Sequence, residues 1–125
     1  DAKKLTVVNV WATWCGPCLM ELPEFVTMNR MYRGRPFQLV TVSLDEIEKQ
    51  PEALRALKEN HVAARNYILD GNKDQFAEAL DREWPGPLPF TVIIAPGGKV
   101  VYRKVGQIEP LEVKRAIVEV LGRTY

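Results

Sequence analysis

The sequence predicts an α/β domain with a mixed central sheet and helices on both of its faces. Along the first two thirds of the chain, β-branched apolar runs alternate with segments of helical period, which is typical of parallel strands joined by helices. Two further strand-like runs flank Pro96-Gly97-Gly98, which predicts an antiparallel hairpin. The 125 residues, 46% of them hydrophobic, suffice for one core, and we expect a single domain over residues 1–125.

Leu5–Trp11 is β-branched and apolar on both faces, as in a central strand. The next helix is expected from about Pro17 to Tyr32, because proline suits a first helical turn and apolar residues follow at helical spacing. Pro23 falls inside this helix and should kink it. Phe37–Leu44 is the second predicted strand.

Prolines and one capping sequence mark the middle of the chain. A helix from Pro51 to about Asn60 is expected to bury Ala53, Leu54, Ala56 and Leu57. A short strand is predicted at Asn66–Leu69. Asn72, with Gln75 three residues later, forms a capping-box signature for a helix that extends to about Arg82.

The last third contains a rigid loop, a hairpin and a helix. Trp84–Pro89 is too rich in proline for regular structure. Phe90–Ala95 and Lys99–Val105 are the hairpin strands. The final helix begins at Pro110 and ends before Gly122. Its predicted apolar face consists of Val113, Ala116, Ile117, Val120 and Leu121.

The composition argues against several classes of partner. The 17 basic and 16 acidic residues are mixed along the chain, and the net charge is +1, so we expect no nucleic-acid partner and no polybasic membrane patch. We expect no membrane-spanning segment, because no apolar run approaches the roughly 20 residues of a span. Residues 1–4 lack the apolar part of a signal peptide. Without an initiator Met, they suggest a trimmed or processed chain.

The only two cysteines, Cys15 and Cys18, directly follow the first strand. Sites in open α/β sheets gather at the carboxyl ends of strands. A cysteine at the start of the next helix would also have its thiolate stabilised by the helix dipole. The spacing lets Cys15 attack a disulfide and Cys18 resolve the product. We therefore expect dithiol–disulfide exchange, with Cys15 as the more exposed nucleophile.

Two other interpretations of this spacing stay open on the residues alone: a pair of ordinary buried cysteines, or part of a zinc site. A structural zinc ion takes four ligands, whereas the chain offers two cysteines and His61. We interpret His61, near a helix end, as solvated or facing the helix dipole. Leu19 excludes haem attachment, which needs His directly after the second cysteine. We expect no metal and no cofactor other than a redox-active Cys15–Cys18 disulfide.

The stretch Trp14-Cys15-Gly16-Pro17-Cys18 resembles the active site of the thioredoxin superfamily. Trp11 and Trp14 match the two tryptophans that precede the motif in thioredoxins. Pro23 matches the family's helix-kinking proline, and Pro89 its cis-proline. The resemblance implies a thioredoxin-like fold and a thiol-disulfide oxidoreductase.

Further matches are to the extracytoplasmic TlpA/ResA-like branch, which is related to AhpC/TSA proteins. They are Cys15-x-x-Cys18-x-x-Glu21-x-Pro23 and the segment Pro89–Val100. The branch has a strand–helix insert before its cis-proline, which we place within about Ala64–Arg82. Its N-terminal hairpin is expected to be missing or trimmed here. The resemblance implies a location outside the cytoplasm, in the periplasm or anchored to a membrane and facing it, while a cytoplasmic location stays open.

The resemblance also implies roles for individual residues. The expected client-binding residues are Trp14, Gly16, Pro17, Leu88 and Pro89. Pro89 should be cis, and Leu88 should offer its main chain to an extended client segment. Trp84 is expected either in an apolar rim with Trp14 and Leu88 or packed in the core.

Proton transfer needs a different residue from that of plain thioredoxins. They carry a buried Asp six residues before the first cysteine, where this chain has Asn9, which cannot titrate. The strand Phe37–Leu44 also lacks the lysine that accompanies that Asp. Glu21 shares a helix face with Cys18, so we expect it to be partly buried, with a raised pKa, and to accept the Cys18 proton as a catalytic base. An exposed helical glutamate is the alternative.

Gly16-Pro17 between the cysteines also occurs in reducing thioredoxins, whereas strongly oxidising relatives carry His before the second cysteine. We therefore expect a protein-disulfide reductase that works through a mixed disulfide. The alternatives are a disulfide oxidase or isomerase on the same scaffold, or a structural zinc-linked domain. The expected partners are protein disulfide or dithiol clients and an upstream thiol electron donor, and we expect a monomer.

Overall fold

The computed structural model describes residues 2–122. Its elements are β1 (Leu5–Trp11), α1 (Gly16–Met31), β2 (Phe37–Ser43), a short 3₁₀ helix (Ile47–Lys49), α2 (Gln50–Glu59), β3 (Arg65–Ile68), α3 (Lys73–Leu80), β4 (Phe90–Ile94), β5 (Val100–Val105) and α4 (Pro110–Leu121). Every predicted strand and helix is present, with small shifts at the ends. Domain extent over residues 1–125 stays a prediction, because residues 1 and 123–125 lie outside the described part.

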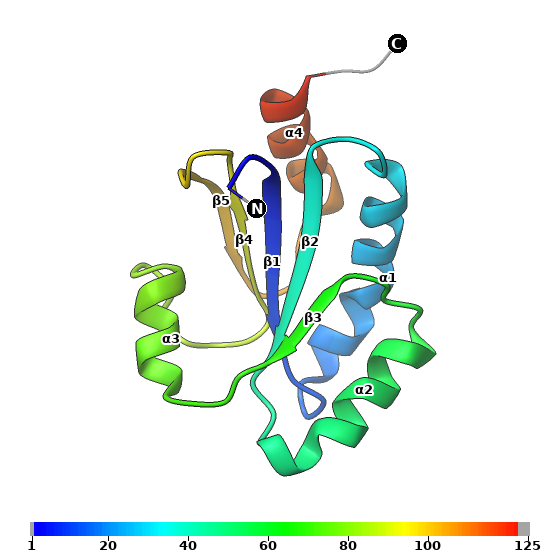
Figure 1. Ribbon diagram of the computed structural model, residues 1–125, viewed down its shortest axis with the longest axis vertical. Coiled ribbons are helices and arrows are strands. Elements are labelled where there is room, and N and C mark those ends of the chain that lie inside the picture. Colours follow the sequence, from blue (N-terminus) through cyan, green and yellow to red (C-terminus); the bar gives the residue numbers. More distant parts are fainter. Residues whose placement is uncertain (1, 123–125) are drawn as a thin grey trace.

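The sheet is mixed, as predicted, with strand order β3-β2-β1-β4-β5 (Figure 1). β1, β2 and β3 run parallel, while β4 is antiparallel to both β1 and β5. β1 is therefore the central strand, and its carboxyl end leads directly into the segment that contains both cysteines. The expected hairpin of β4 and β5 is confirmed.

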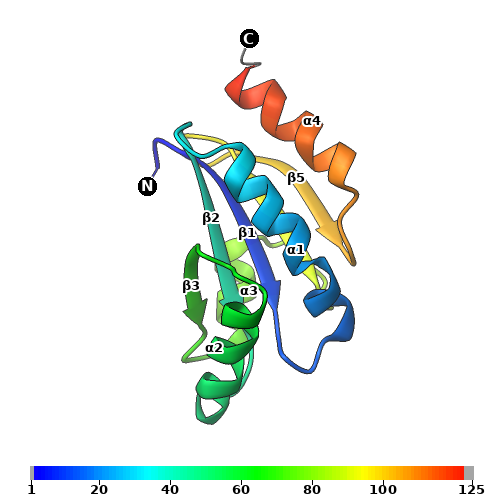
Figure 2. The same cartoon turned by 90° about the vertical axis from the view of Figure 1, so that its right-hand side faces the viewer.

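Helices cover both faces of the sheet, which confirms the predicted layers (Figure 2). Side chains of β1 alternate between these faces because strand residues point to opposite sides in turn. Leu5 and Val7 pack with residues of α1 and α4, and Trp11 packs with residues of α1 and α2. Val8 and Val10 belong to a third cluster, against which α3 packs on the opposite face.

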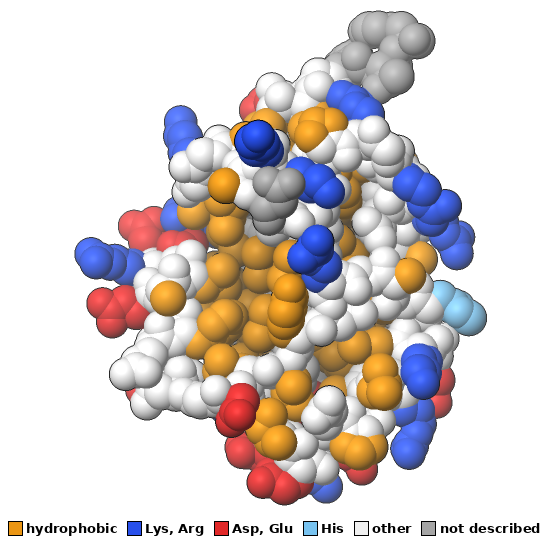
Figure 3. Space-filling view, in the orientation of Figure 1, with side chains coloured by type: hydrophobic (Ala, Val, Ile, Leu, Met, Phe, Trp, Pro, Cys, Tyr) orange, Lys and Arg blue, Asp and Glu red, His pale blue; other side chains and the backbone are white. Residues whose placement is uncertain are grey.

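Hydrophobic side chains gather on the face seen in Figure 3, beside α3. Trp84 belongs to the core under this face: it is only 8% exposed and stacks on Phe90 with 4.9 Å between ring centroids. Its indole Nε1 donates a hydrogen bond to the Pro87 carbonyl at 2.9 Å. The expectation that Trp84 belongs to an apolar rim is therefore wrong, and the core alternative is correct, because the indole finds both a stacking partner and an acceptor inside the fold.

A row of buried polar residues crosses the middle of the sheet on the α1 side. Asn9 lies beside Thr41 of β2 and Thr91 of β4 in the strand register, and all three are fully buried. Thr41 Oγ1 donates to Asn66 Oδ1 of β3 at 2.6 Å. Because buried polar groups need hydrogen-bond partners, this row is where a polar side chain from a helix can be accommodated inside the domain.

Two residues noted in the sequence, His61 and Asn72, lie at helix ends. His61 is exposed, as expected, and adopts a left-handed φ of 58° after α2. The Val62 and His61 N–H groups donate to Leu57 O and Lys58 O at 2.9 and 3.1 Å, a Schellman motif that ends the helix. Asn72 caps α3, since its Oδ1 accepts from Gln75 N at 2.9 Å.

Two details of the helices differ from the expectation or go beyond it. α2 buries Ala53 and Leu57, but Leu54 is 49% exposed, so its predicted burial is wrong. Ala53 and Leu57 lie one helical turn apart and form a narrow apolar stripe, and Leu54 lies outside this stripe. α1 continues through Pro23 to Met31, and the kink expected at Pro23 stays a prediction.

Candidate active site

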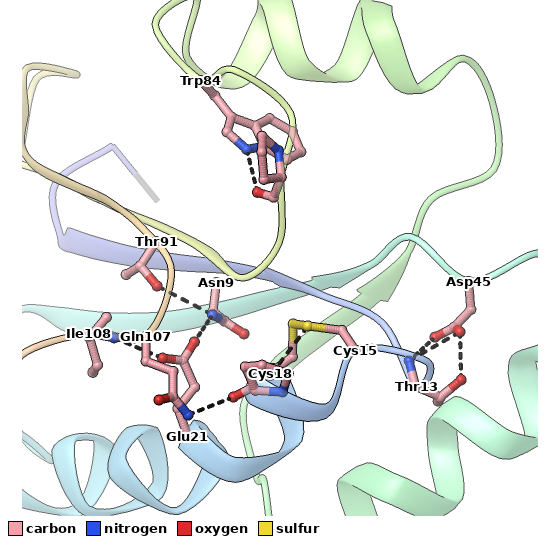
Figure 4. The surroundings of a disulfide bond; sticks show 12 residues. Asn9, Thr13, Cys15, Cys18, Glu21, Asp45, Trp84, Thr91, Gln107 and Ile108 are labelled. Atoms are coloured by element: carbon pink, nitrogen blue, oxygen red, sulfur yellow. Dashed lines mark hydrogen bonds between the residues drawn. A yellow bond between two sulfur atoms is a disulfide. The ribbon is translucent and has the colours of Figure 1, made fainter.

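The two cysteines form a disulfide at the start of α1 (Figure 4). The S–S distance is 2.10 Å. Cys15 is the N-cap residue of the helix, and its Sγ accepts a hydrogen bond from Cys18 N at 3.3 Å. The N-terminal turn of a helix carries unpaired N–H groups and a partial positive charge, both of which stabilise a thiolate. The position that the sequence predicted for Cys15 is confirmed.

The two cysteines differ in exposure in the expected direction. Cys15 is 6% exposed and Cys18 is fully buried. Gly16 and Pro17 between them are exposed, and Trp14 just before them is 67% exposed. The disulfide therefore lies at the surface edge of a small hydrophobic cluster, with Cys15 on the outer side.

The Leu88–Pro89 peptide bond is cis, as predicted. Leu88 packs against the cluster that contains both cysteines, so the loop before β4 lies next to the disulfide. The Pro89 carbonyl accepts a hydrogen bond from Gly106 N at 2.8 Å. The structure thus brings together the residues that the sequence placed in a client-binding role, and that role stays a prediction.

Glu21 lies inside the domain, only 3% exposed, so the exposed alternative is wrong. Its Oε1 accepts from Asn9 Nδ2 at 3.1 Å, and its Oε2 accepts from Ile108 N at 2.9 Å. Asn9 Nδ2 also donates to Thr91 Oγ1 at 3.3 Å. The carboxyl group therefore joins the buried polar row of the sheet, on the same side of α1 as Cys18 (Figure 4).

Burial raises the pKa of Glu21 to about 7, from an ordinary value of 4.5, because the charged form loses its hydration. The hydrogen bonds from Ile108 N and Asn9 oppose this effect, since they favour the carboxylate. With a pKa near neutrality, Glu21 can both accept and release a proton at physiological pH. The expected raised pKa is confirmed, and the burial is more complete than expected.

The loop between β5 and α4 closes the site from the other side. Ile108 in this loop binds Glu21, and Gln107 Nε2 donates to the Pro17 carbonyl at 3.2 Å. No sequence pattern points to these contacts, because 87 residues separate Ile108 from Glu21. Asp45, which binds Thr13, was also missed as a site residue. The only available signal was its position at the end of the second strand.

The described residues contain neither a grouped set of metal ligands nor a helix that could span a membrane. Between residues 2 and 122, no three or more His, Cys, Asp or Glu side chains are grouped so that they could hold a metal ion. Both cysteines are joined to each other, so neither offers a thiolate to a metal in this state. Among the helices of this part of the chain, none has the length and hydropathy to cross a bilayer.

Comparison with protein families and curated proteins gives consistent matches. The family model described as Redoxin matches residues 1–119. The chain is similar to the thiol-disulfide oxidoreductase ResA of Oceanobacillus iheyensis, with 29% identity over 97 residues, 78% of this chain and 47% of that protein. It spans about half the length of the curated relatives that it matches first.

Solved structures show the same architecture. A thiol:disulfide interchange protein of the thioredoxin family from Chlorobium tepidum TLS superposes with a TM-score of 0.79 and 25% identity, over 97% of this chain and 83% of that chain. A thioredoxin-related protein from Neisseria meningitidis serogroup B superposes with a TM-score of 0.78 and 26% identity, over 95% of this chain and 86% of that chain. The predicted thioredoxin-like fold and the similarity to ResA are confirmed.

The buried carboxyl group predicts a pH dependence of stability. Between pH 4.5 and about 7, folded Glu21 holds a proton that the unfolded chain releases. The stability that protonated Glu21 contributes is therefore fully present below its pKa in the unfolded chain, and it is lost as pH rises to about 7. Glu21→Gln removes this titration. Relative to wild type, the unfolding free energy of the variant should rise across this interval by on the order of 2 kcal/mol.

Denaturant unfolding of the oxidised chain at a series of pH values measures this difference. Glu24→Gln is the matched control, because Glu24 is exposed on the same helix and its variant should follow wild type. Parallel pH dependences for wild type and Glu21→Gln would show that Glu21 does not titrate in this range.

Proposed function

The chain belongs to the Redoxin family, and we propose that it is a thiol-disulfide oxidoreductase that reduces disulfide bonds in client proteins. The observation that carries this proposal is the Cys15–Cys18 disulfide at the N-terminus of α1, with the outer sulfur on Cys15. The similarity to ResA supports the reaction class. The disulfide is then the redox centre, and the exchange needs no other cofactor.

The reaction takes two exchange steps. In the reduced protein, the Cys15 thiolate attacks one sulfur of a client disulfide, forms a mixed disulfide and expels the other client sulfur as a thiolate, which takes a proton from water. Cys18 then loses its proton and attacks the Cys15 sulfur. The mixed disulfide breaks, and the first client sulfur leaves. Two electrons have passed to the client, and the Cys15–Cys18 disulfide has formed.

Glu21 accepts the Cys18 proton in the second step. Cys18 is fully buried, so its thiol has no direct contact with bulk water, and a nearby base is needed to form its thiolate. Glu21 is the buried base that the fold supplies, and its pKa of about 7 leaves a large carboxylate fraction at neutral pH. Asn9 Nδ2 and Ile108 N each donate to one of its two oxygens and hold it in place.

The client binds as an extended segment beside the disulfide. The residues that we assign to this role are Trp14, Gly16, Pro17, Leu88 and Pro89. Pro89 has no N–H to compete for the sulfurs, and Leu88 offers main-chain groups for a short β-strand pairing. Trp14, which is 67% exposed, provides apolar contact area.

Electrons flow from an upstream thiol donor to the client in this proposal. Gly16-Pro17 supports this direction, because neither residue stabilises the reduced form as a neighbouring His would. Oxidation or isomerisation by the same disulfide is the alternative. The resemblance to the TlpA/ResA-like branch supports a location outside the cytoplasm, and we propose that the chain acts there as a monomer.

Turnover with a protein disulfide such as that of insulin, in the presence of a small thiol donor, tests the reaction class. Wild type should reduce the substrate, and Cys15→Ser should be inactive. Cys18→Ser should instead accumulate a mixed disulfide on Cys15, because the resolving thiol is absent. Metal analysis completes the test: a chain that holds one zinc ion per molecule and reduces no disulfide would refute the proposal.

Glu21→Gln tests the proton acceptor. The rate of mixed-disulfide formation should be unchanged, whereas resolution by Cys18 should slow by about 10²-fold. In wild type the resolution rate should rise with pH as Glu21 loses its proton near pH 7, and in the variant this rise should disappear. Single-turnover kinetics separate the two steps, with Glu24→Gln as control. If wild type and Glu21→Gln give the same pH profile for resolution, Glu21 is not the base.

A further inference from the structure

The segment between β1 and α1 is a tight turn that presents the outer cysteine. Cys15 N donates to Ala12 O at 3.1 Å, which closes a four-residue turn. Thr13 and Trp14 are its central residues, and Trp14 is 67% exposed. The conformation of this turn therefore sets where the Cys15 sulfur lies relative to the helix N-terminus.

A buried carboxylate holds the turn from outside the motif. Asp45 is 3% exposed and lies just beyond β2. Its Oδ1 and Oδ2 accept from Thr13 N at 3.1 and 3.0 Å, and Oδ1 also accepts from Thr13 Oγ1 at 2.7 Å. Figure 4 shows Asp45 facing Thr13 on the opposite side of the turn from Glu21. Such bonds to a charged acceptor are among the stronger hydrogen bonds in proteins.

Ser43, the last residue of β2, fixes the orientation of the Asp45 carboxylate. Ser43 Oγ donates to Asp45 Oδ2 at 2.5 Å and accepts from Asp45 N at 3.0 Å. Ser43 is 1% exposed. Leu44 N donates to Trp11 O at 2.8 Å, so the two strands stay paired up to this point. The orientation of the Asp45 carboxylate is therefore set by Ser43, independently of its contacts with Thr13.

We propose that Asp45 is a positioning residue for the exchange reaction: through Thr13 it holds the turn that keeps the Cys15 sulfur against the N-terminus of α1. None of its hydrogen bonds involves a sulfur atom, so opening of the disulfide removes none of their donors or acceptors. After reduction, the Cys15–Cys18 bond no longer restrains Cys15, and the Asp45–Thr13 contact continues to hold the turn that presents its sulfur at the helix N-cap. The inference deepens the proposed function and rests on it.

The sign of the effect separates positioning from a simple charge effect. Loss of the turn's restraint moves the sulfur away from the helix N-terminus, which raises the pKa of the Cys15 thiol. Loss of a nearby negative charge by itself lowers the pKa of a thiol. Thr13→Val removes the hydroxyl donor without any change of charge, so it reports the restraint alone.

Titration of the Cys15 thiolate by its ultraviolet absorbance in reduced protein is the test, in a Cys18→Ser background that leaves one thiol. Thr13→Val should raise the Cys15 pKa by about one unit, so that the thiolate fraction at a pH below the pKa falls about tenfold. The rate of mixed-disulfide formation should then fall about threefold, because a more basic thiolate is also more nucleophilic. Thr13→Ser keeps the hydroxyl and should match the parent.

Asp45→Asn and Asp81→Asn form the second comparison. Asp45→Asn should raise the Cys15 pKa, as Thr13→Val does. Asp81 is also a buried carboxylate that accepts a main-chain N–H, but it lies at the end of α3. Asp81→Asn should lose stability with an unchanged Cys15 pKa.

Two results would overturn the proposal. In the first, Thr13→Val and Asp45→Asn lower the unfolding free energy while the Cys15 pKa and the exchange rate stay at the parent values, which would show a structural role only. In the second, the Cys15 pKa falls in Asp45→Asn and stays unchanged in Thr13→Val, which would show that Asp45 acts only through its charge. The thiol titration needs no client, so it remains decisive even if wild type fails to reduce protein disulfides.

Discussion

Burial of the Glu21 carboxyl group is the constraint around which the elements of this site are arranged. An ionisable group that is 3% exposed is costly unless it is hydrogen-bonded or neutral. The fold meets that requirement with donors from two distant segments, Asn9 of β1 and Ile108 of the β5–α4 loop. Asn9 in turn bonds Thr91 of β4. The carboxyl group thereby links the central sheet, α1 and the last loop, and its raised pKa follows from the same burial.

The disulfide lies between two carboxyl groups with different environments. Glu21 is buried beside the inner cysteine and has a pKa of about 7, which suits it to exchange a proton. Asp45 accepts hydrogen bonds from Thr13 and Ser43, which suits it to hold the turn before the outer cysteine. In the exchange that we propose, each cysteine therefore has its own carboxyl group: Glu21 takes the proton of Cys18, and Asp45 positions Cys15.

Much of this arrangement could be predicted because it is encoded locally. The strand before Cys15, the helix after it and the Asn72 cap all follow from short-range patterns, and cis-Pro89 followed from family resemblance. The contacts of Asp45, Thr91 and Ile108 could not be predicted, because they join segments far apart in the chain with no pattern of their own. Leu54 was predicted to be buried because helical spacing identifies an apolar face but not how much of it the sheet covers.

The direction of electron flow is the central claim, and the reduction potential of the Cys15–Cys18 pair tests it most directly. Equilibration of the chain with thiol–disulfide buffers of known potential gives this value. A reductant with Gly-Pro between its cysteines should have a potential near that of thioredoxin, about −270 mV. A potential of about −120 to −180 mV, in the range of disulfide oxidases and isomerases, would contradict the reductase account.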